Sequence, residues 1–388
     1  MTPLLFALPW IGVLAFLILV VRPPRELPPA KAEGVGERPR VSVIIPARNE
    51  KLNIENCVAS VSRSLYPDFE IIVVDDRSDD DTAAIARALP IGNARRIRVV
   101  DGKELPVGWL GKPWACCQGF HDADGDVLLF TDADTTHGPQ LLARAVAGMR
   151  DEKADLMTVL GRQIMGSFWE RPVQPQVFLT MVFRFPRFER TAKNGRWRDA
   201  IANGQYILMP RTSYLAIGGH EAVRDEVVED LALAQLVKRE GLQLRVRMAN
   251  KDFATRMYRS LGGIIEGWSK NILMGGLQSL PPVLRPFMFP VALTFGVGLW
   301  LVPPLVLLAT FLGAGGPALF TWSATVCAIS AIVFAGFTRL MGGPARYGLL
   351  YPLGAVMGNY IFLRSWIRGR NVEWKGRRYT VPDISERP

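Results

Sequence analysis

Short apolar runs rich in β-branched residues alternate with helix-length stretches through the middle of the chain. The runs are 41–45, 70–74, 96–100 and 126–130, and the intervening helix-length stretches include 50–64, 80–89 and 139–150. This alternation is typical of βα units, in which helices cover both faces of a parallel sheet. The pattern therefore predicts an α/β domain with a mostly parallel sheet over residues 41–255.

Both ends of the chain carry longer apolar stretches. Residues 4–21 hold no charge and basic residues begin at Arg22, which predicts an N-terminal transmembrane anchor over 1–21 whose C-terminal end faces the cytoplasm. A cleaved signal peptide is the alternative, but no basic residue precedes the stretch and no small-residue cleavage site follows it. Residues 22–40 are rich in Pro and polar residues, which is typical of a linker.

Three further apolar stretches lie near the C-terminus, and each is close to the roughly 20 residues that a bilayer crossing requires. They are 287–311, 317–338 and 347–367. Together they predict a membrane bundle over 287–367. We expect interfacial helices at 256–286 before this bundle and a basic cytoplasmic tail at 368–388 after it.

The expected topology contains a conflict. An N-terminal crossing followed by three more would place the basic tail outside, whereas Lys and Arg favour the cytoplasmic side. One C-terminal stretch is therefore expected to lie in the interface, so that two to three transmembrane segments form the C-terminal end. The weakest stretches are 287–311, which Pro303 and Pro304 interrupt, and 347–367, which carries Asn359 and Arg364.

Composition narrows the function classes. Apolar residues make up 49% of the chain and charged residues 21%, which excludes disordered and fibrous proteins. The 46 Lys and Arg exceed the 36 Asp and Glu by 10, which fits a nucleic acid, an anionic membrane or a phosphorylated substrate equally well. The four Cys show neither a disulfide pattern nor a C-x-x-C spacing, so we interpret them as reduced and expect no zinc site.

Residues 163–202 interrupt the α/β pattern with aromatic side chains interleaved with Arg. Such a segment can stack on nucleic-acid bases or lie in a membrane interface. Because apolar stretches flank the domain on both sides, we favour an interfacial helix beside the entry path of a lipid, and we expect no nucleic-acid partner.

Carboxylates follow two of the predicted strands. Asp75 and Asp76 come directly after 70–74, and Asp132 and Asp134 follow 126–130. Ligands of open α/β sheets bind at the carboxyl ends of the strands, and a continued strand geometry would aim both carboxylates of an Asp-x-Asp to one side. Two hard oxygen donors suit Mg²⁺ or Mn²⁺, which in turn suits a diphosphate. The alternative for an isolated Asp-x-Asp is a loop with Asx turns.

Several motifs occur together in a fixed order. They are VSVIIPARNE (41–50), VVDDRSDDDT (73–82), LPVGWLGKPWACCQG (105–119), the Asp-x-Asp and GGHEAVRDEVVEDLALAQ (218–235). Over residues 41–271 the chain resembles family-2 glycosyltransferases, the inverting GT-A class that uses nucleotide-diphospho-sugars. The segments NGQYILMPR (203–211), TRMYRSL (255–261) and EGWSKN (266–271) are most similar to bacterial membrane glycosyltransferases of the carotenoid-acid (diaponeurosporenoate) type. Hopanoid-associated and ceramide glucosyltransferases are more distantly similar.

The resemblance implies a donor site at the first strand ends. Pro46, Ala47 and Glu50 would line the nucleobase and ribose pocket, although a helix-start acid is an equal interpretation of Glu50. Asp76 would accept a hydrogen bond from the uracil N–H, which suits an acceptor-only carboxylate. Lys112 matches a family position near the nucleotide, where its charge would serve the base or a phosphate, and a solvated surface Lys is the alternative.

The resemblance also implies the catalytic groups. Asp132 and Asp134 would orient the donor, with Asp134 contacting a divalent metal (Mg²⁺ or Mn²⁺) that stabilises the departing diphosphate. Inverting transfer needs a base that takes the acceptor proton, and Asp230 is the candidate. Glu229 would support it at the start of an amphipathic helix, where a simple helix-capping acid is the alternative.

Other positions are assigned less directly. His220, Trp268 and Lys270 would shape or support the acceptor site, although a packed His is an equal interpretation of His220. Residues 373–379 loosely resemble a Trp/Gly/Arg gating motif of hyaluronan and chitin synthases, which implies bidentate phosphate contacts from Arg377. A cluster that binds anionic lipids is the alternative.

The expected fold is therefore a GT-A nucleotide-diphospho-sugar transferase fold with one N-terminal and two to three C-terminal transmembrane segments. The expected protein is multi-pass in the cell membrane, with its catalytic domain in the cytoplasm, and moves one sugar from a UDP-sugar donor to a lipid acceptor. A processive polysaccharide synthase is an alternative, disfavoured because Gln-x-x-Arg-Trp is missing after the base. A silent nucleotide-binding scaffold is another, disfavoured because all the expected carboxylates are present.

Overall fold

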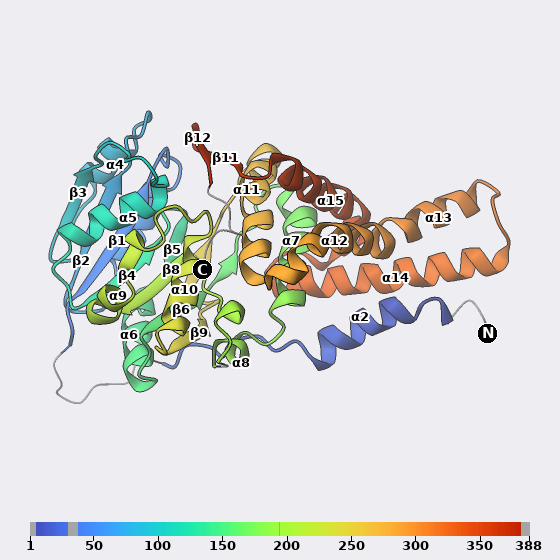
Figure 1. Ribbon diagram of the computed structural model, residues 1–388, viewed down its shortest axis with the longest axis horizontal. Coiled ribbons are helices and arrows are strands. Elements are labelled where there is room, and N and C mark those ends of the chain that lie inside the picture. Colours follow the sequence, from blue (N-terminus) through green and yellow to red (C-terminus); the bar gives the residue numbers. More distant parts are fainter. Residues whose placement is uncertain (1–4, 30–37, 194, 382–388) are drawn as a thin grey trace. The chain divides into compact units, whose positions relative to one another are not determined.

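The computed structural model describes residues 5–29, 38–193 and 195–381 (Figure 1). It forms two compact units that are discontinuous in sequence. The helical unit comprises Met1–Arg22, Gln163–Arg187 and Tyr258–Trp374, and the sheet unit comprises Pro23–Arg162, Phe188–Met257 and Lys375–Pro388. The chain passes between these units several times.

The sheet unit is built on a seven-stranded sheet with the order β3-β2-β1-β4-β8-β6-β9. Its strands are β1 (Val41–Ala47), β2 (Phe69–Asp75), β3 (Ile97–Asp101), β4 (Val127–Thr131), β6 (Leu156–Leu160), β8 (Tyr206–Pro210) and β9 (Leu244–Met248). All neighbours pair in parallel except β8, which runs antiparallel to both β4 and β6. The prediction of a mostly parallel α/β sheet is confirmed.

The alternation of side chains along β1 explains why its sequence is apolar throughout. Val43 and Ile45 pack into one buried cluster, whereas Ile44 between them packs into a second cluster. All three are fully buried, because successive residues of a strand point to opposite faces and helices cover both faces here. The first cluster includes residues of α3 (Ile54–Ser62) and α6 (Leu141–Asp151), and the second includes residues of α5 (Gly111–Asp122) and α10 (Glu229–Arg239).

Strand β5 (Thr135–His137) follows the Asp-x-Asp segment and pairs antiparallel with β10 (Phe253–Thr255) in a second, three-stranded sheet. The remaining elements of this unit are α4 (Thr82–Ala88), α8 (Phe188–Lys193), η1 (Trp197–Asp199), α9 (Arg211–Ala216), η2 (Gly219–Glu221) and β12 (Arg377–Thr380). Strand β7 (Arg162–Gln163) lies where the chain first leaves the sheet unit.

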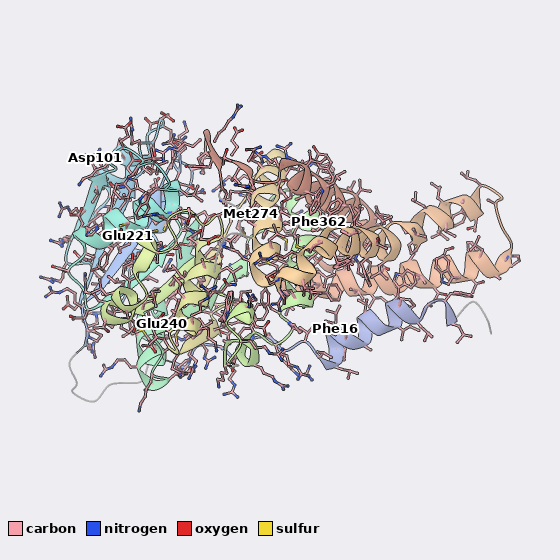
Figure 2. All side chains as sticks on the ribbon, viewed as in Figure 1. Phe16, Asp101, Glu221, Glu240, Met274 and Phe362 are labelled. Atoms are coloured by element: carbon pink, nitrogen blue, oxygen red, sulfur yellow. The ribbon has the colours of Figure 1, made fainter. Side chains whose placement is uncertain are left out.

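The helical unit contains α2 (Leu8–Leu19), α7 (Glu170–Arg184), α11 (Leu261–Ser279), η3 (Pro282–Leu284), α12 (Arg285–Trp300), α13 (Val302–Phe311), α14 (Pro317–Leu340), η4 (Ala345–Leu350), α15 (Tyr351–Arg368) and β11 (Asn371–Trp374). The indole N–H of Trp10 donates to the carbonyl of Leu299 at 2.8 Å, which ties α2 to α12. Glu266 on α11 pairs with both Arg364 and Arg368 on α15. Phe16 on α2, labelled in Figure 2, stacks on Phe183 of α7 with ring centroids 5.6 Å apart.

Two segments of the described chain are long and apolar enough to cross a membrane, Pro282–Phe311 and Pro317–Leu340. This number agrees with the lower end of the two to three C-terminal segments expected. The stretch that Pro303 interrupts is one of them, because proline fits the first turn of α13, where no helical N–H bond is lost. The stretch at 347–367 is not, because its helix α15, which includes Asn359, Arg364 and Arg368, is not apolar enough.

The N-terminal anchor is not confirmed as a full crossing. Helix α2 has 12 residues, which corresponds to about 18 Å at 1.5 Å per residue, whereas a bilayer core is roughly 30 Å thick. The helix packs against the other apolar helices of its unit, with Ala7 and Trp10 buried.

Candidate active site

A half-buried lysine joins carboxylates from two distant parts of the sheet unit. Lys112 lies in the first turn of α5, and its Nζ is 2.7 Å from Asp132 Oδ1 and 2.7 Å from Glu229 Oε1. Asp132 directly follows β4, and Glu229 begins α10. Burial alone would lower the pKa of Lys112, but the charges of Asp132, Glu229 and Asp230 outweigh it and hold the pKa well above its ordinary value. Lys112 is therefore a permanent cation among these acids.

The Asp-x-Asp segment differs in geometry from the expectation. Strand β4 ends at Thr131 and a turn covers Ala133 and Asp134, so the two carboxylates are brought together by a turn instead of by the strand pleat. Asp134 is held by Thr255, whose hydroxyl lies 3.2 Å from Asp134 Oδ1. Burial, followed by the nearby charge of Asp132, raises the pKa of Asp134 to about 7.

These two aspartates fit a hard divalent cation. Magnesium-like ions are commonly bound by one or two carboxylates together with substrate phosphates, so the donor itself would supply the remaining ligands. The part of the chain that the structure describes contains no group of three or more His, Cys, Asp and Glu placed to hold a metal. Burial raises the pKa of Asp132 as well, although Lys112 partly offsets this effect, so the pair is short of positive charge.

Asp230 is oriented by the backbone. Its Oδ2 accepts a hydrogen bond from the N–H of Gly204 at 2.6 Å, and its Oδ1 accepts one from the N–H of Leu231 at 2.8 Å. Burial, and then the neighbouring charge of Glu229, raises the pKa of Asp230 to about 6. The carboxylate is therefore fixed in position and still has a proton affinity suited to work near neutral pH.

Gly204 is a site residue that the sequence reasoning missed. A Cβ at this position would lie 3.0 Å from both Asp230 Oδ2 and Lys112 Nζ, so a side chain would press on the ammonium and the carboxylate together. Its signal was present in the sequence, because Asn203 and Gly204 open the segment 203–211 that carries the family resemblance.

The residues expected to bind the nucleobase meet at the ends of β1 and β2. The N–H of Asp76 donates to the carbonyl of Ala47 at 2.7 Å, which fixes the loop after β2 next to the end of β1. Arg48, a second residue missed from the sequence, is buried and donates from Nη1 to the carbonyls of Asp76 and Arg77, both at 2.6 Å. Pro46 lies within β1, paired in register with Val74.

Arg377 and Glu50 complete this end of the sheet. Arg377 Nη1 lies 2.5 Å from Asp76 Oδ2, and Lys375 Nζ lies 2.9 Å from Glu50 Oε1. Burial raises the pKa of Asp76, and the bond and charge of Arg377 only partly reverse this shift. Glu50 also accepts from the side-chain amide of Asn53 at 2.7 Å.

The expected acceptor residues are divided between the two units of the chain. His220 is buried in the sheet unit. Its backbone N–H donates to Tyr214 Oη at 2.9 Å, and its ring centroid lies 4.5 Å from that of Phe130. Burial lowers its pKa to about 3, as expected for a packed, neutral histidine. Trp268 and Lys270 belong to α11 in the helical unit, and the Trp268 ring packs on that of Phe178 at 5.4 Å.

The sheet topology and the carboxylates at its strand ends define a GT-A-like enzyme fold. Residues 42–217 match the family model described as glycosyl transferase family 2. The 4,4'-diaponeurosporenoate glycosyltransferases of Staphylococcus aureus strains MRSA252 and USA300 are each 26% identical over 355 residues, which is 88% of this chain and 88% of theirs. The chain is thus similar to glycosyltransferases of family 2 over residues 42–217.

A solved structure supports the same fold over nearly the whole chain. The mannosyltransferase PcManGT from Pyrobaculum calidifontis, determined in complex with GDP-Man and Mn²⁺, superposes with a TM-score of 0.54 at 17% sequence identity. The match covers 94% of this chain and 94% of that one.

Proposed function

We propose that this enzyme transfers a single sugar from a UDP-sugar to a hydroxyl or carboxyl group of a lipid, with inversion, at the cytoplasmic face of the membrane. The observation that carries the proposal is the bridge made by Lys112, because it joins the donor-side carboxylate Asp132 to Glu229, the neighbour of Asp230. Donor orientation and proton removal are thus assigned to groups that share one half-buried cation.

Asp230 is proposed as the base. As the acceptor oxygen attacks the anomeric carbon, its proton passes to the carboxylate, while the nucleoside diphosphate leaves on the opposite side. Two backbone N–H bonds hold the carboxylate in place, so little reorganisation is needed for proton transfer. A pKa of about 6 keeps most of Asp230 ionised at pH 7.

The donor is proposed to lie along the ends of β1, β2 and β4. Asp76, Glu50, Pro46 and Ala47 would receive the base and ribose, and Arg377 would contact the phosphates. Asp134, with Asp132, would hold a Mg²⁺ or Mn²⁺, which supplies positive charge that stabilises the departing diphosphate. The structure of PcManGT, which was determined with GDP-Man and Mn²⁺, supports a nucleotide-sugar donor and a divalent metal.

A lipid acceptor is supported by the curated relatives and by the helical unit. The relatives are named as glycosyltransferases of 4,4'-diaponeurosporenoate, a carotenoid acid. In this chain, large apolar side chains on α12 and α13 are exposed, including Phe287, Phe295, Leu305 and Phe311. A surface of this kind suits lipid tails, which supports membrane residence of the segments that are long enough to cross.

The proposal is tested with membranes that contain the full-length chain, Mn²⁺ and a panel of labelled UDP-sugars, followed by partition into organic solvent. Asp230→Asn removes the base, and Glu240→Gln is the matched control, because Glu240 follows the other end of the same helix and is exposed (Figure 2). We expect label in the organic phase for the wild type and for Glu240→Gln, and a loss of about a thousandfold for Asp230→Asn.

Other results would contradict the proposal in distinct ways. Label that remains in the aqueous phase as high-mass material would indicate polymer synthesis. Equal transfer by Asp230→Asn and wild type would exclude Asp230 as the base. If no UDP-sugar is used while another nucleotide-sugar is, the uridine assignment is wrong and the family assignment stands.

A further inference from the structure

The C-terminal strand β12 contacts the same side chains to which the donor nucleobase is assigned. Arg377 Nη1 reaches Asp76 Oδ2, and Arg377 Nη2 lies 3.4 Å from the carbonyl oxygen of the same residue. The residues from Lys375 onward belong to the sheet unit, so these contacts lie within one compact unit.

Lys375 adds a second set of contacts two residues before Arg377. Its ammonium lies 2.9 Å from Glu50 Oε1 and 3.1 Å from the carbonyl of Asn49, and its own carbonyl accepts a hydrogen bond from Arg48 Nε at 3.1 Å. The two carboxylates proposed for base and ribose recognition, Glu50 and Asp76, are therefore each paired with a cation of the tail.

Among the described residues, only one of the two oxygens of the Asp76 carboxylate has a hydrogen-bond partner. The side chain is 2% exposed, with Oδ2 bound by Arg377, whereas Oδ1 is buried and accepts no hydrogen bond from the described residues. A buried, unpartnered carboxylate oxygen is an acceptor that lacks a donor, and the imide N–H of a uracil is a donor of the required kind. Arg377, however, lies against the carboxylate that this N–H would approach.

A glycine permits the close approach of the tail. A Cβ on Gly111, at the start of α5, would lie 2.9 Å from Asp76 Oδ2 and 3.0 Å from Arg377 Nη1. Only a residue without a side chain leaves space for the guanidinium and the carboxylate together at this point.

We propose that residues 375–379 form a displaceable latch over the nucleobase pocket, in which Arg377 must exchange Asp76 for the diphosphate of the donor before the base can bind fully. This inference rests on the proposed function. Guanidinium groups bind carboxylate and phosphate with the same two-pronged geometry, so the exchange conserves the charge pairing of Arg377. Asp76, in turn, gains the base N–H in place of a cation.

The charge arrangement gives the latch a role when no donor is present. Without Arg377, Asp76 would lose its ion-pair partner and would be a buried carboxylate beside Asp75, with only the nearby charge of Arg48 to offset it. A buried carboxylate that loses its partner is destabilising, so the tail stabilises the empty site. The donor brings negative phosphate charge with its base, which provides Arg377 with a new partner.

The test compares uridine with UDP, because uridine competes with the latch and offers it no phosphate. Binding of each labelled probe to the purified full-length chain is measured by equilibrium dialysis for wild type and Arg377→Ala. We expect uridine to bind about fivefold more tightly to Arg377→Ala, because the competing conformation is removed. UDP loses a phosphate contact in the same variant, so the ratio of UDP affinity to uridine affinity falls at least tenfold.

Two further variants keep the result interpretable. Lys375→Ala removes the contact of the latch with Glu50, so uridine is expected to bind more tightly to this variant as well. Arg378→Ala is the matched control, since Arg378 is exposed on the same strand, and both affinities should stay at wild-type values.

Unchanged or weaker uridine binding in Arg377→Ala would overturn the latch, even if UDP binding and sugar transfer proceed as proposed. Failure of the wild type to bind uridine, UDP, guanosine and GDP would overturn both the latch and the proposed function. The two failures are therefore distinguishable.

Discussion

Two aspartates of the sheet unit, the half-buried Asp132 and the buried Asp76, are paired with cations of different origin. Asp132 pairs with Lys112, which lies in a helix packed on the sheet, whereas Asp76 pairs with Arg377, which lies on the C-terminal strand. In both cases burial raises the pKa of the aspartate more than its partner lowers it. Similar local charge pairs can therefore serve different purposes, because one cation lies on a helix packed on the sheet and the other lies on the C-terminal strand that we propose to be displaceable.

Lys112, the fixed cation, has more acidic partners than Arg377, the displaceable one. Lys112 contacts Asp132 and Glu229 and is influenced by Asp230, so its removal leaves three carboxylates without their common counter-ion. Arg377 serves the single carboxylate of Asp76. We therefore expect substitution of Lys112 to have a larger effect than substitution of Arg377, with the donor and acceptor identified by the transfer assay.

The largest expected effect follows loss of the fixed cation. Lys112→Met should lower the transfer rate by more than a hundredfold and destabilise the fold by about 3 kcal/mol, because the buried Glu229 and the half-buried Asp132 lose the cation that they share. Chemical unfolding and transfer are measured in parallel, with Lys103→Met as the control, since Lys103 precedes the same helix and is exposed. A folded Lys112→Met with a normal transfer rate would contradict the role of the bridge.

The pH profile should show the base directly. Because Asp230 must be ionised to accept a proton and its pKa is raised to about 6, the transfer rate should fall about tenfold per unit below pH 6 and level off above pH 7. The folded state binds this proton more tightly than the unfolded chain, so the contribution of Asp230 to the unfolding free energy falls as pH rises from about 4 to 6. A rate that stays constant down to pH 5 would argue against this base.

A smaller effect is expected at Gly204. Gly204→Ala places a Cβ about 3.0 Å from Asp230 Oδ2 and Lys112 Nζ, which should lower kcat about tenfold and leave the KM for the donor nearly unchanged. Gly195→Ala is the control, because a Cβ there meets nothing within 4 Å. A rise in KM with constant kcat would place Gly204 in donor binding instead.

The smallest effect is expected at Arg48. Arg48→Gln removes two hydrogen bonds to the loop after β2, which carries Asp76, so the KM for the donor should rise about fivefold with kcat retained. Steady-state kinetics with varied donor separate the two parameters. A drop in kcat alone would show that the loop affects the chemistry and not the donor.

The sequence predicted the sheet well, because its short β-branched runs are typical of strands that are buried on both faces. It also indicated Asp132, Glu229 and Lys112 as separate site residues, and the structure shows that Lys112 pairs with the other two. It did not predict the turn at Asp134 or the position of Gly204, because both depend on contacts between segments that are far apart in sequence. The candidate membrane segments were harder still, since α2 is strongly apolar but has only 12 residues, and α15 mixes apolar residues with Asn359, Arg364 and Arg368.

One measurement tests the comparison most directly, the transfer rate at saturating donor for Lys112→Met and Arg377→Ala side by side. The account predicts a loss of more than a hundredfold for Lys112→Met and a change of no more than about threefold for Arg377→Ala, because saturation compensates for a contact that serves donor binding. Equal losses in the two variants would contradict it, since the tail cation would then take part in the chemistry as the fixed one does.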